Sequence, residues 1–443
     1  MKRIAAVDIF RAITMLLMLF VNDFAGMKGI PHWMKHAAMN EDMMGFSDLI
    51  FPAFLFCMGM SVPLAIQSRI KKGDSTLQII NYIVQRSFAL IVMGLFTLNS
   101  GGISGGLSHQ WFLLLMVIGF FLVWGVYPKC EGNKKAIISA LKLLGIALLA
   151  GLVIYKDIHG KPFHIGWWGI LGLIGWTYAV CAFIYLFTQG KLKSIVWAWV
   201  ATMILCVLNH TTLIPNEFSS RVVLLSFIPG GWTHHALGMA GVVCTLLMQR
   251  YANNQHPKHF MHLLIIIGIN MLLLAIGSHH LWIISKIQAT PPWLFYSLAL
   301  FFPLFALCYW LTDVKGKANW FTLIKPAGEA TLTCYILPYV WYSVQQLLGV
   351  NWPSVLCQGM PGLLKALLFA FLIVWLTGWL IKVKIKLKVY ARKEDKNVSC
   401  NRLKINVWST LVWSERDTCV EQTPHLTGVN GTQVWNKYPS SGL

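Results

Sequence analysis

The chain has 443 residues, of which 56% are hydrophobic and only 12% are charged, and its formal net charge is +20. Soluble domains carry about 25% charged residues, so this composition excludes an ordinary soluble protein and indicates an integral membrane protein. The basic residues cluster between apolar runs, which favours orientation in a bilayer over the binding of nucleic acid.

Apolar runs recur along the chain at about the ~20 residues that a spanning helix needs. They lie near 8–28, 46–67, 81–99, 111–127, 136–155, 166–188, 194–213, 231–249, 260–277, 293–312, 320–348 and 363–387. The expected fold class is all-α: a polytopic membrane helical bundle of about 12 transmembrane helices, within a range of about 10 to 12. Residues 1–390 form the transmembrane domain. The apolar pattern stops near Lys396, so residues 391–443 are expected to be a polar, poorly ordered cytoplasmic tail.

Every second connection between the runs is rich in lysine and arginine. The basic connections hold Lys2 and Arg3; Arg69, Lys71 and Lys72; Lys129, Lys134 and Lys135; Lys191 and Lys193; Arg250 and Lys258; Lys315 and Lys317; and Lys382 to Lys393. Lysine and arginine mark cytoplasmic loops, so we expect both termini in the cytoplasm and the loop around His36 on the outer side. The first run holds Asp8 and Arg11 and lacks a cleavage site, so it is expected to stay in the membrane.

The cytoplasmic start of the first run holds an acidic and a basic residue. Asp8 and Arg11 are three positions apart and therefore share one helix face. They form either a local ion pair that anchors the helix end or a functional pair. In the functional interpretation, Arg11 helps bind an anionic cofactor that enters from the cytoplasm, because guanidinium suits phosphate.

The loop between the first two runs is the candidate catalytic region. Asn22 and Asp23 end the first helix, and His36 follows in WMKHAAMN. A lone loop histidine is more often structural than catalytic, but this one lies between two spans and near Asn22 and Asp48. Neutral imidazole is a common general base or acyl-accepting nucleophile. Asn22 either caps its helix or aims its amide at a reacting carbonyl or at an imidazole.

Asp48 stands at the start of the second run, in SDLIFP. We expect Ser47 or Asp48 to be the N-cap of this helix, with Pro52 tolerated in the first turns. Asp48 is also positioned to orient His36. His32 lies four residues before His36, a spacing that would suit a metal site on a helix, but Pro31 opposes a regular helix and no metal is expected.

Two further charges lie inside apolar runs, namely Arg86 in the third and Glu329 in the eleventh. Charges within a membrane are functional candidates by default, although each can simply have an internal partner. About 12 helices with internal charges would also suit a transporter, which is the alternative class. Against it, the sequence has no visible inverted repeat.

Several stretches resemble the transmembrane acetyltransferases of the heparan-α-glucosaminide N-acetyltransferase type and their bacterial relatives. They are VDIFRAITMLLMLFVND, WMKHAAMN, FSDLIFPAFLFCMGMSVPLAI, RSFALIVMGLF from Arg86, GILGLIGWTYAVCA and WLFYSLALFFPLFALCYWLTDVKG. The resemblance covers roughly residues 4–390. It implies acetyl transfer from cytoplasmic acetyl-CoA to a sugar amine across the membrane, with the family's catalytic Asn and His at Asn22 and His36.

The chain also departs from that family. Gly172 and Leu173 stand where the family usually has a Gln-Arg pair, and IPGGW at 228–232 replaces an acidic DPEG-like stretch. Residues 111–155 look like an inserted helix pair. These departures leave the acceptor open.

We therefore predict a membrane acyltransferase, an acetyl-CoA-dependent N- or O-acetyltransferase of the bacterial cytoplasmic (inner) membrane. The catalytic residues are His36, Asn22 and Asp48; the residues that bind the donor are Arg11, Asp8 and Arg86. The donor is acetyl-CoA. The expected partners are the lipid bilayer and a sugar or glycan acceptor, with a homodimer left open. The alternative is a polytopic membrane transporter of a small polar or sugar-like solute.

Overall fold

A computed structural model describes residues 5–101, 108–127, 132–159, 162–164, 169–211, 231–252 and 256–388. Within these ranges the chain forms helices and no strand, apart from isolated bridges between Lys28 and Gln358 and between Gly125 and Leu387. The all-α prediction is therefore confirmed. The predicted tail at 391–443 lies outside the described residues.

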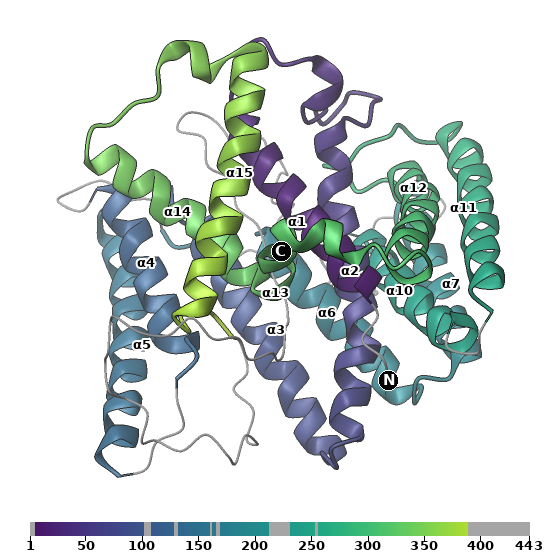
Figure 1. Cartoon of the computed structure of the whole chain (residues 1–443), viewed down its shortest axis with the longest axis horizontal. Helices are drawn as coiled ribbons and strands as arrows, with labels where there is room; N and C mark the ends of the chain where they lie inside the picture. The colour runs from purple at the N-terminus through teal and green to yellow at the C-terminus, as the bar shows by residue number, and fades with distance from the viewer. Residues whose placement is uncertain are drawn as a thin grey trace.

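The α-helices follow one another along the whole described chain (Figure 1). They are α1 (Ala5–Phe24), α2 (Phe46–Ile70), α3 (Thr76–Leu98), α4 (His109–Trp124), α5 (Asn133–His159), α6 (Ile170–Phe187), α7 (Leu192–Asn209), α10 (Thr233–Leu247), α11 (Pro257–His279), α12 (Pro291–Tyr309), α13 (Lys325–Glu329), α14 (Thr331–Leu347) and α15 (Gly359–Lys382). Short 3-10 turns lie at His32–Met34, Ala318–Ile324 and Ser354–Cys357, and π-helical turns at Met248–Ala252 and Trp310–Val314 extend α10 and α12.

Nine of the described helices are long and apolar enough to cross a bilayer, and the chain is an integral membrane protein. Each of the twelve predicted runs contains at least one helix, but α4, α10 and α14 have only 16, 15 and 17 residues. The number of spans that meet the length requirement is therefore lower than the predicted number in the described part of the chain. The run at 320–348 is not a single span, because it divides into a 3-10 turn, α13 and α14.

The first two helices lie at the centre of the bundle (Figure 1). Helix α2 packs along α10 and α6, whereas α13 and α15 pack against α1. In the apolar window of α2, 83% of the residues are buried, against 17% in that of α5. The helix pair α4 and α5, which corresponds to the predicted insertion at 111–155, lies at the edge of the bundle (Figure 1).

Glycines allow α2 and α10 to approach closely. A Cβ atom added to Gly59 would lie 1.8 Å from the carbonyl oxygen of Gly238, and one added to Gly241 would lie 2.0 Å from that of Phe56. Small residues let helix backbones pack in a membrane, where no hydrophobic force drives helices together. The result is a tight, fixed contact along the middle of α2.

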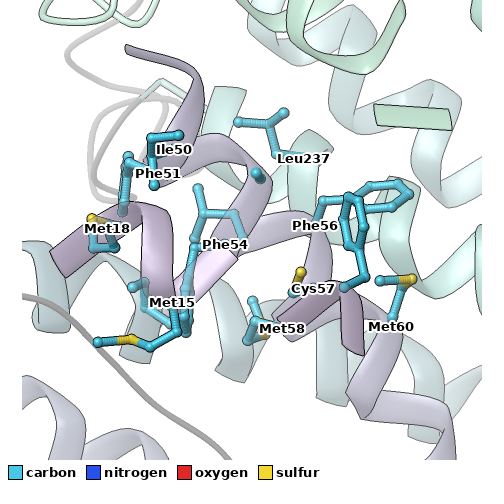
Figure 2. Packing of buried hydrophobic residues seen from close by; sticks show 14 of the residues in the cluster. Met15, Met18, Ile50, Phe51, Phe54, Phe56, Cys57, Met58, Met60 and Leu237 are labelled. Atoms are coloured by element: carbon cyan, nitrogen blue, oxygen red, sulfur yellow. The ribbon is translucent and has the colours of Figure 1, made fainter. Parts of the chain in front are cut away.

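Large side chains fill the space around this contact. Figure 2 shows Met15 and Met18 of α1, Phe54 and Phe56 of α2, and Leu237 of α10 gathered around the α2 backbone. All five are buried in the hydrophobic core. The polar N-terminal turn of α2 is therefore continuous with a helix whose remaining turns are tightly packed in the core.

Contacts between loops define one end of the bundle, which we call the histidine end because it carries His36. The N–H of Gly359 donates to the carbonyl oxygen of Lys28 at 2.9 Å, and the N–H of Ile284 donates to Asp42 Oδ1 at 2.7 Å. The α1–α2, α11–α12 and α14–α15 connections therefore meet there.

The opposite end, which we call the basic end, holds the alternate connections. The backbone N–H groups of Ala5 and Ala6 donate to Asp313 at 3.1 and 2.8 Å, and Gln67 of α2 exchanges hydrogen bonds with Gln249. The connections that these contacts place thus lie at the two ends in the order that the charge alternation predicts. The compartment that each end faces stays a prediction.

Candidate active site at the histidine end

The α1–α2 loop separates His32 from His36. Only His32–Met34 forms a single 3-10 turn, and Lys35 is extended, so the two histidines do not share a helix face. His32 pairs with Glu41 at 3.1 Å, whereas His36 pairs with Asp48 at 2.7 Å. Each histidine thus has its own carboxylate. No three metal-ligating side chains gather within the part of the chain that the structure describes.

Asp48 is held at the start of α2 by backbone groups. The N-cap of α2 is Gly45, so the expectation that Ser47 or Asp48 caps this helix is wrong. Asp48 instead lies in the first turn, and its Oδ2 accepts the N–H of Gly45 at 3.2 Å and that of Ala37 at 3.0 Å. A carboxylate at a helix N-terminus satisfies N–H groups that the helix leaves unpaired. These bonds orient Oδ1 towards His36.

The contact between His36 and Asp48 determines which ring nitrogen is available. Nδ1 of His36 lies 2.7 Å from Oδ1 of Asp48. A carboxylate only accepts, so the hydrogen between the two atoms belongs to Nδ1, and in the neutral ring Nε2 then carries the lone pair. The side chain of Asp48 is 2% exposed and that of His36 is 28% exposed. The imidazole therefore joins a buried anion to a more accessible surface.

A lysine from a distant loop completes this cluster. Nζ of Lys286, in the α11–α12 connection, lies 3.1 Å from Nδ1 of His36 and 3.6 Å from Oδ1 of Asp48. Lys286 was missed in the sequence analysis. A signal was present, since Lys286 lies in one of the alternate connections that hold few lysines and arginines. We call His36, Asp48 and Lys286 the outer triad.

Burial and charge act together on the outer triad. Burial, and then the positive charge of Lys286, lower the pKa of His36 below its ordinary value, while Asp48 opposes this shift. Burial also lowers the pKa of Lys286, again against the attraction of Asp48. Both shifts favour forms with less positive charge.

Several hydrogen bonds hold the loop of Lys286 against the loop of His36. Asp42 accepts the N–H of Ile284 at 2.7 Å, the hydroxyl of Ser285 donates to the carbonyl oxygen of Met39 at 3.0 Å, and Gln288 donates to the same oxygen at 2.9 Å. These bonds flank Lys286 on both sides. The position of Lys286 therefore does not depend on its own charge contacts alone.

Aromatic side chains lie next to Asp48 of the outer triad. Nε1 of Trp293, a fully buried residue, donates to the backbone oxygen of Asp48 at 3.2 Å. The ring of His234 stands edge-on to Trp293 and to Phe51, with centroid distances of 6.1 and 5.4 Å. Sequence reasoning did not single out Trp293 or His234 as individual residues.

Asn22 and Asp23 lie in the last turn of α1, as expected. Lys365 of α15 donates to Oδ2 of Asp23 at 2.6 Å, and the hydroxyl of Tyr342 in α14 donates to Oδ1. Asp23 therefore ties three helices together. The amide nitrogen of Asn22 is buried and has no hydrogen-bond partner among the described residues.

The ion pair predicted at the start of α1 is present. Arg11 lies 3.5 Å from Asp8, and it also donates to the carbonyl oxygen of Gly328 at 3.2 Å and to Ser61 Oγ at 3.1 Å. Arg11 is 2% exposed. It therefore joins α1 to α2 and α13 inside the bundle.

Arg86 and Glu329 also have internal partners. Arg86 donates to the hydroxyl of Tyr82 at 3.0 Å and lies 4.5 Å from the centroid of the Tyr178 ring. Glu329 lies 3.5 Å from Nζ of Lys325. Both charges are thus accommodated by neighbouring side chains.

The departure at residues 172 and 173 has a packing explanation. A Cβ atom added to Gly94 of α3 would lie 2.3 Å from the backbone nitrogen of Gly172, so a close contact between α3 and α6 occupies this position. Leu173 is buried in the core. In the other departure, Trp232 has a φ of 72°, while residues 228–230 lie outside the described part.

These observations define a polytopic helical membrane protein with a buried charged cluster at one end. A sequence profile of the family described as "Domain of unknown function (DUF5009)" matches residues 3–235, and the chain belongs to this family.

Part of the chain is also similar to heparan-alpha-glucosaminide N-acetyltransferase from two mammals. It is 39% identical to the Mus musculus protein over 108 residues, which are 24% of this chain and 16% of the mouse protein. It is 39% identical to the Homo sapiens protein over 107 residues, which are 24% of this chain and 15% of the human protein. The relationship therefore concerns a segment that is a small part of each relative.

Proposed function

We propose that the protein is a membrane acyltransferase that moves an acetyl group from acetyl-CoA to an amino sugar or another glycan, with His36 as the reacting imidazole. The observation that carries the proposal is the 2.7 Å contact between His36 Nδ1 and Asp48 Oδ1, which leaves Nε2 with the lone pair. The similarity of a segment to enzymes named as N-acetyltransferases supports the same reaction class.

The proposed reaction needs a base or a nucleophile that is neutral. The acceptor nitrogen attacks the thioester carbonyl, the new C–N bond forms, and the C–S bond breaks. Nε2 of His36 takes the proton of the amine and returns it to the leaving thiolate. In the two-step form, Nε2 attacks the thioester carbonyl, the C–S bond breaks, and the thiolate leaves while Nε2 carries the acetyl group. The amine then attacks this acetyl group, the bond to Nε2 breaks, and Nε2 takes the proton of the amine and passes it to the thiolate. A hydroxyl acceptor follows the same steps and yields an ester.

Asn22 is assigned to the thioester oxygen. Its amide nitrogen is a buried donor with no partner among the described residues. Such a donor costs about 1–3 kcal/mol when it stays unpaired, so a substrate carbonyl that accepts from it gains a strong contact. Donors of this kind stabilise the negative charge that develops during acyl transfer.

The donor is proposed to enter from the basic end. Its phosphates are too highly charged to cross the apolar core, and alternate loops at that end carry the lysines and arginines. Arg11, Asp8 and Arg86 are the proposed donor contacts. Both arginines are almost fully buried, so they are suited to the part of the donor that enters the bundle. In this scheme only the acetyl end reaches Asn22 and His36.

Acetyl transfer by purified protein tests the proposal. The protein in detergent is given labelled acetyl-CoA with glucosamine-terminated saccharides, and His36→Ala is compared with His32→Ala. His32 is the matched control, since it lies in the same loop and pairs with a different carboxylate. We expect transfer in the wild type and in His32→Ala and its loss in His36→Ala. Full transfer by His36→Ala would overturn the mechanism.

The same preparation distinguishes the alternative of a transporter. Protein in liposomes would be tested for flux of small sugar-like solutes, together with acetyl transfer to amine and hydroxyl acceptors. Solute flux without any acetyl transfer would replace the proposed enzyme with a transporter. We expect transfer without flux.

The proposed direction of transfer makes a prediction about orientation in the bacterial cytoplasmic membrane. A reporter fused after Lys388 is expected on the cytoplasmic side, together with the basic end. An external reporter would reverse the orientation and place the donor on the wrong side. The measurement needs only reporter activity in whole cells.

A further inference from the structure

Lys286 occupies a place in the outer triad that a structural role alone does not explain. Its side chain is 10% exposed, and Nζ lies 3.6 Å from Asp48 Oδ1 and 3.1 Å from His36 Nδ1. Burying a lysine is costly unless an anion compensates for it. Its loop is already fixed by the hydrogen bonds of Ser285 and Gln288 to Met39. The charge of Lys286 is therefore not needed to hold its loop and acts instead on the carboxylate of Asp48 and the imidazole of His36.

The charge balance shows what Lys286 changes. With Asp48 alone, a buried carboxylate in contact with an imidazole favours the charged imidazolium, because an opposite charge stabilises it. An imidazolium can neither remove a proton nor accept an acetyl group. Lys286 places a positive charge beside the same carboxylate oxygen. Lys286 thereby offsets part of the stabilisation that Asp48 gives to a charged ring, while the Nδ1–H bond of His36 to Asp48 is kept.

Two other histidines of this region each pair with a carboxylate of their own. In the α1–α2 loop, His32 pairs with Glu41, and Asp42 pairs with His279 at the end of α11. Among the described residues, Asp48 of α2 and Lys286 of the α11–α12 connection act on the charge of His36, in addition to its burial. The two charges in contact with His36 therefore act on its protonation in opposite directions, beside the effect of burial.

We propose that Lys286 is a positioning residue that offsets the charge of Asp48 and so, together with burial, favours the neutral ring of His36 in the resting protein. Its importance for acetyl transfer rests on the proposed function. Its effect on the protonation of His36 does not, and this effect can be measured without any substrate.

The first experiment measures the neutral fraction of His36 directly. Diethyl pyrocarbonate modifies neutral imidazole, and peptide mass spectrometry follows the rate at His36 against pH in the intact protein in detergent. The variants are Lys286→Met and Lys286→Gln, which remove the charge, Lys286→Arg, which keeps it, and Lys35→Met as a control in the same loop.

We expect the pH midpoint of modification to rise in both uncharged variants, with a rate at pH 6.5 about threefold lower or more. Lys286→Arg and Lys35→Met should keep the wild-type midpoint. Unchanged midpoints in Lys286→Met and Lys286→Gln would overturn the inference. So would the same shift in Lys286→Arg, since charge would then not be the cause.

The second experiment measures the pH dependence of acetyl transfer. The acid limb of kcat/KM should move to higher pH in Lys286→Met and return in Lys286→Arg. If the wild type transfers no acetyl group, the proposed function fails, whereas the modification midpoints still decide the role of Lys286. A purely structural lysine would lower activity at every pH and leave the limb in place.

Discussion

The histidine end contains two buried lysine–aspartate pairs that differ in their third member. Asp23 and Lys365 approach to 2.6 Å, and Asp48 and Lys286 to 3.6 Å, while both carboxylates are 2% exposed. Tyr342 completes the first pair and His36 completes the second. A phenol keeps its proton near neutral pH, whereas an imidazole gains or loses one there. The first pair is therefore a fixed clamp, and the second is able to respond to a proton.

The two pairs also differ in what holds the carboxylate. Asp23 depends on side chains from α14 and α15, so its partners join three helices. Asp48 also accepts two backbone N–H groups, from Gly45 at the start of its own helix and from Ala37 in the α1–α2 loop. Removing a lysine should therefore have different consequences at the two sites: loss of stability at Asp23, and a change of protonation at Asp48.

The largest difference between the pairs is expected for activity when the carboxylates are changed. Asp48→Asn should lower kcat of acetyl transfer by about 10³- to 10⁴-fold, because an amide cannot hold the imidazole in the required tautomer. Asp23→Asn should retain most of the activity. Comparable losses in the two variants would remove the distinction between clamp and reactive pair.

Replacing the two lysines should have effects on the free energy of unfolding that differ clearly between the pairs. Lys365→Met leaves Asp23 as a buried charge without its cation and should cost about 3–5 kcal/mol. Lys286→Met should cost less, since Asp48 keeps His36 and its backbone donors. Thermal unfolding in detergent measures both variants. The double variant Asp23→Asn with Lys365→Met should regain part of the loss, and an unchanged loss would argue against the ion pair as its cause.

The pH dependence of the wild type should show the effect of the outer triad. The lowered pKa of His36 means that its neutral form persists below the ordinary value of 6.5. Acetyl transfer should therefore continue below pH 6.5 and fall only as the pH passes through the lowered pKa. The folded protein binds fewer protons than the unfolded chain in that window, so acidification there also reduces stability. An acid limb above pH 6.5 would contradict this prediction.

Single hydrogen bonds around the two pairs should have the smallest effects. Tyr342→Phe removes the hydroxyl donor to Asp23, and Trp293→Phe removes the N–H donor to the backbone of Asp48. Each should cost about 1 kcal/mol in thermal unfolding. Neither should move the acid limb of acetyl transfer. A shift of the acid limb in Trp293→Phe would show that the aromatic side chains next to Asp48 also affect the protonation of His36.

The fold was largely predictable because membrane helices depend on local composition. Each apolar run contains a helix, although the first begins at Ala5 and ends at Phe24 where 8–28 was expected. The prediction that residues 320–348 form a single span was wrong. It begins as a 3-10 turn and breaks between α13 and α14 at Ala330. A long hydropathy window hides such a break, because the short polar segment KPAGE is averaged with the apolar residues on both sides of it.

The candidate site was only partly predictable. The contact of His36 with Asp48 follows from their places at the two sides of one short loop. Lys286 lies 250 positions from His36, and no periodicity or spacing connects them. Arg11 shows the same limit, because its spacing predicts Asp8, whereas Ser61 and Gly328 become its partners only through packing.

The long separations within the two pairs have a consequence for biosynthesis. The α1–α2 hairpin is made first, yet Lys286 follows His36 by 250 residues and Lys365 follows Asp23 by 342. At about 5–20 residues per second, the two aspartates wait tens of seconds for their cations while the intervening helices enter the bilayer. During that interval neither carboxylate has its lysine, although Asp48 can already bond to His36 and to the backbone of its own hairpin. The hairpin therefore reaches its final position late, when α12 and α15 have been synthesised and inserted. A chain that stops before α11 has neither ammonium group.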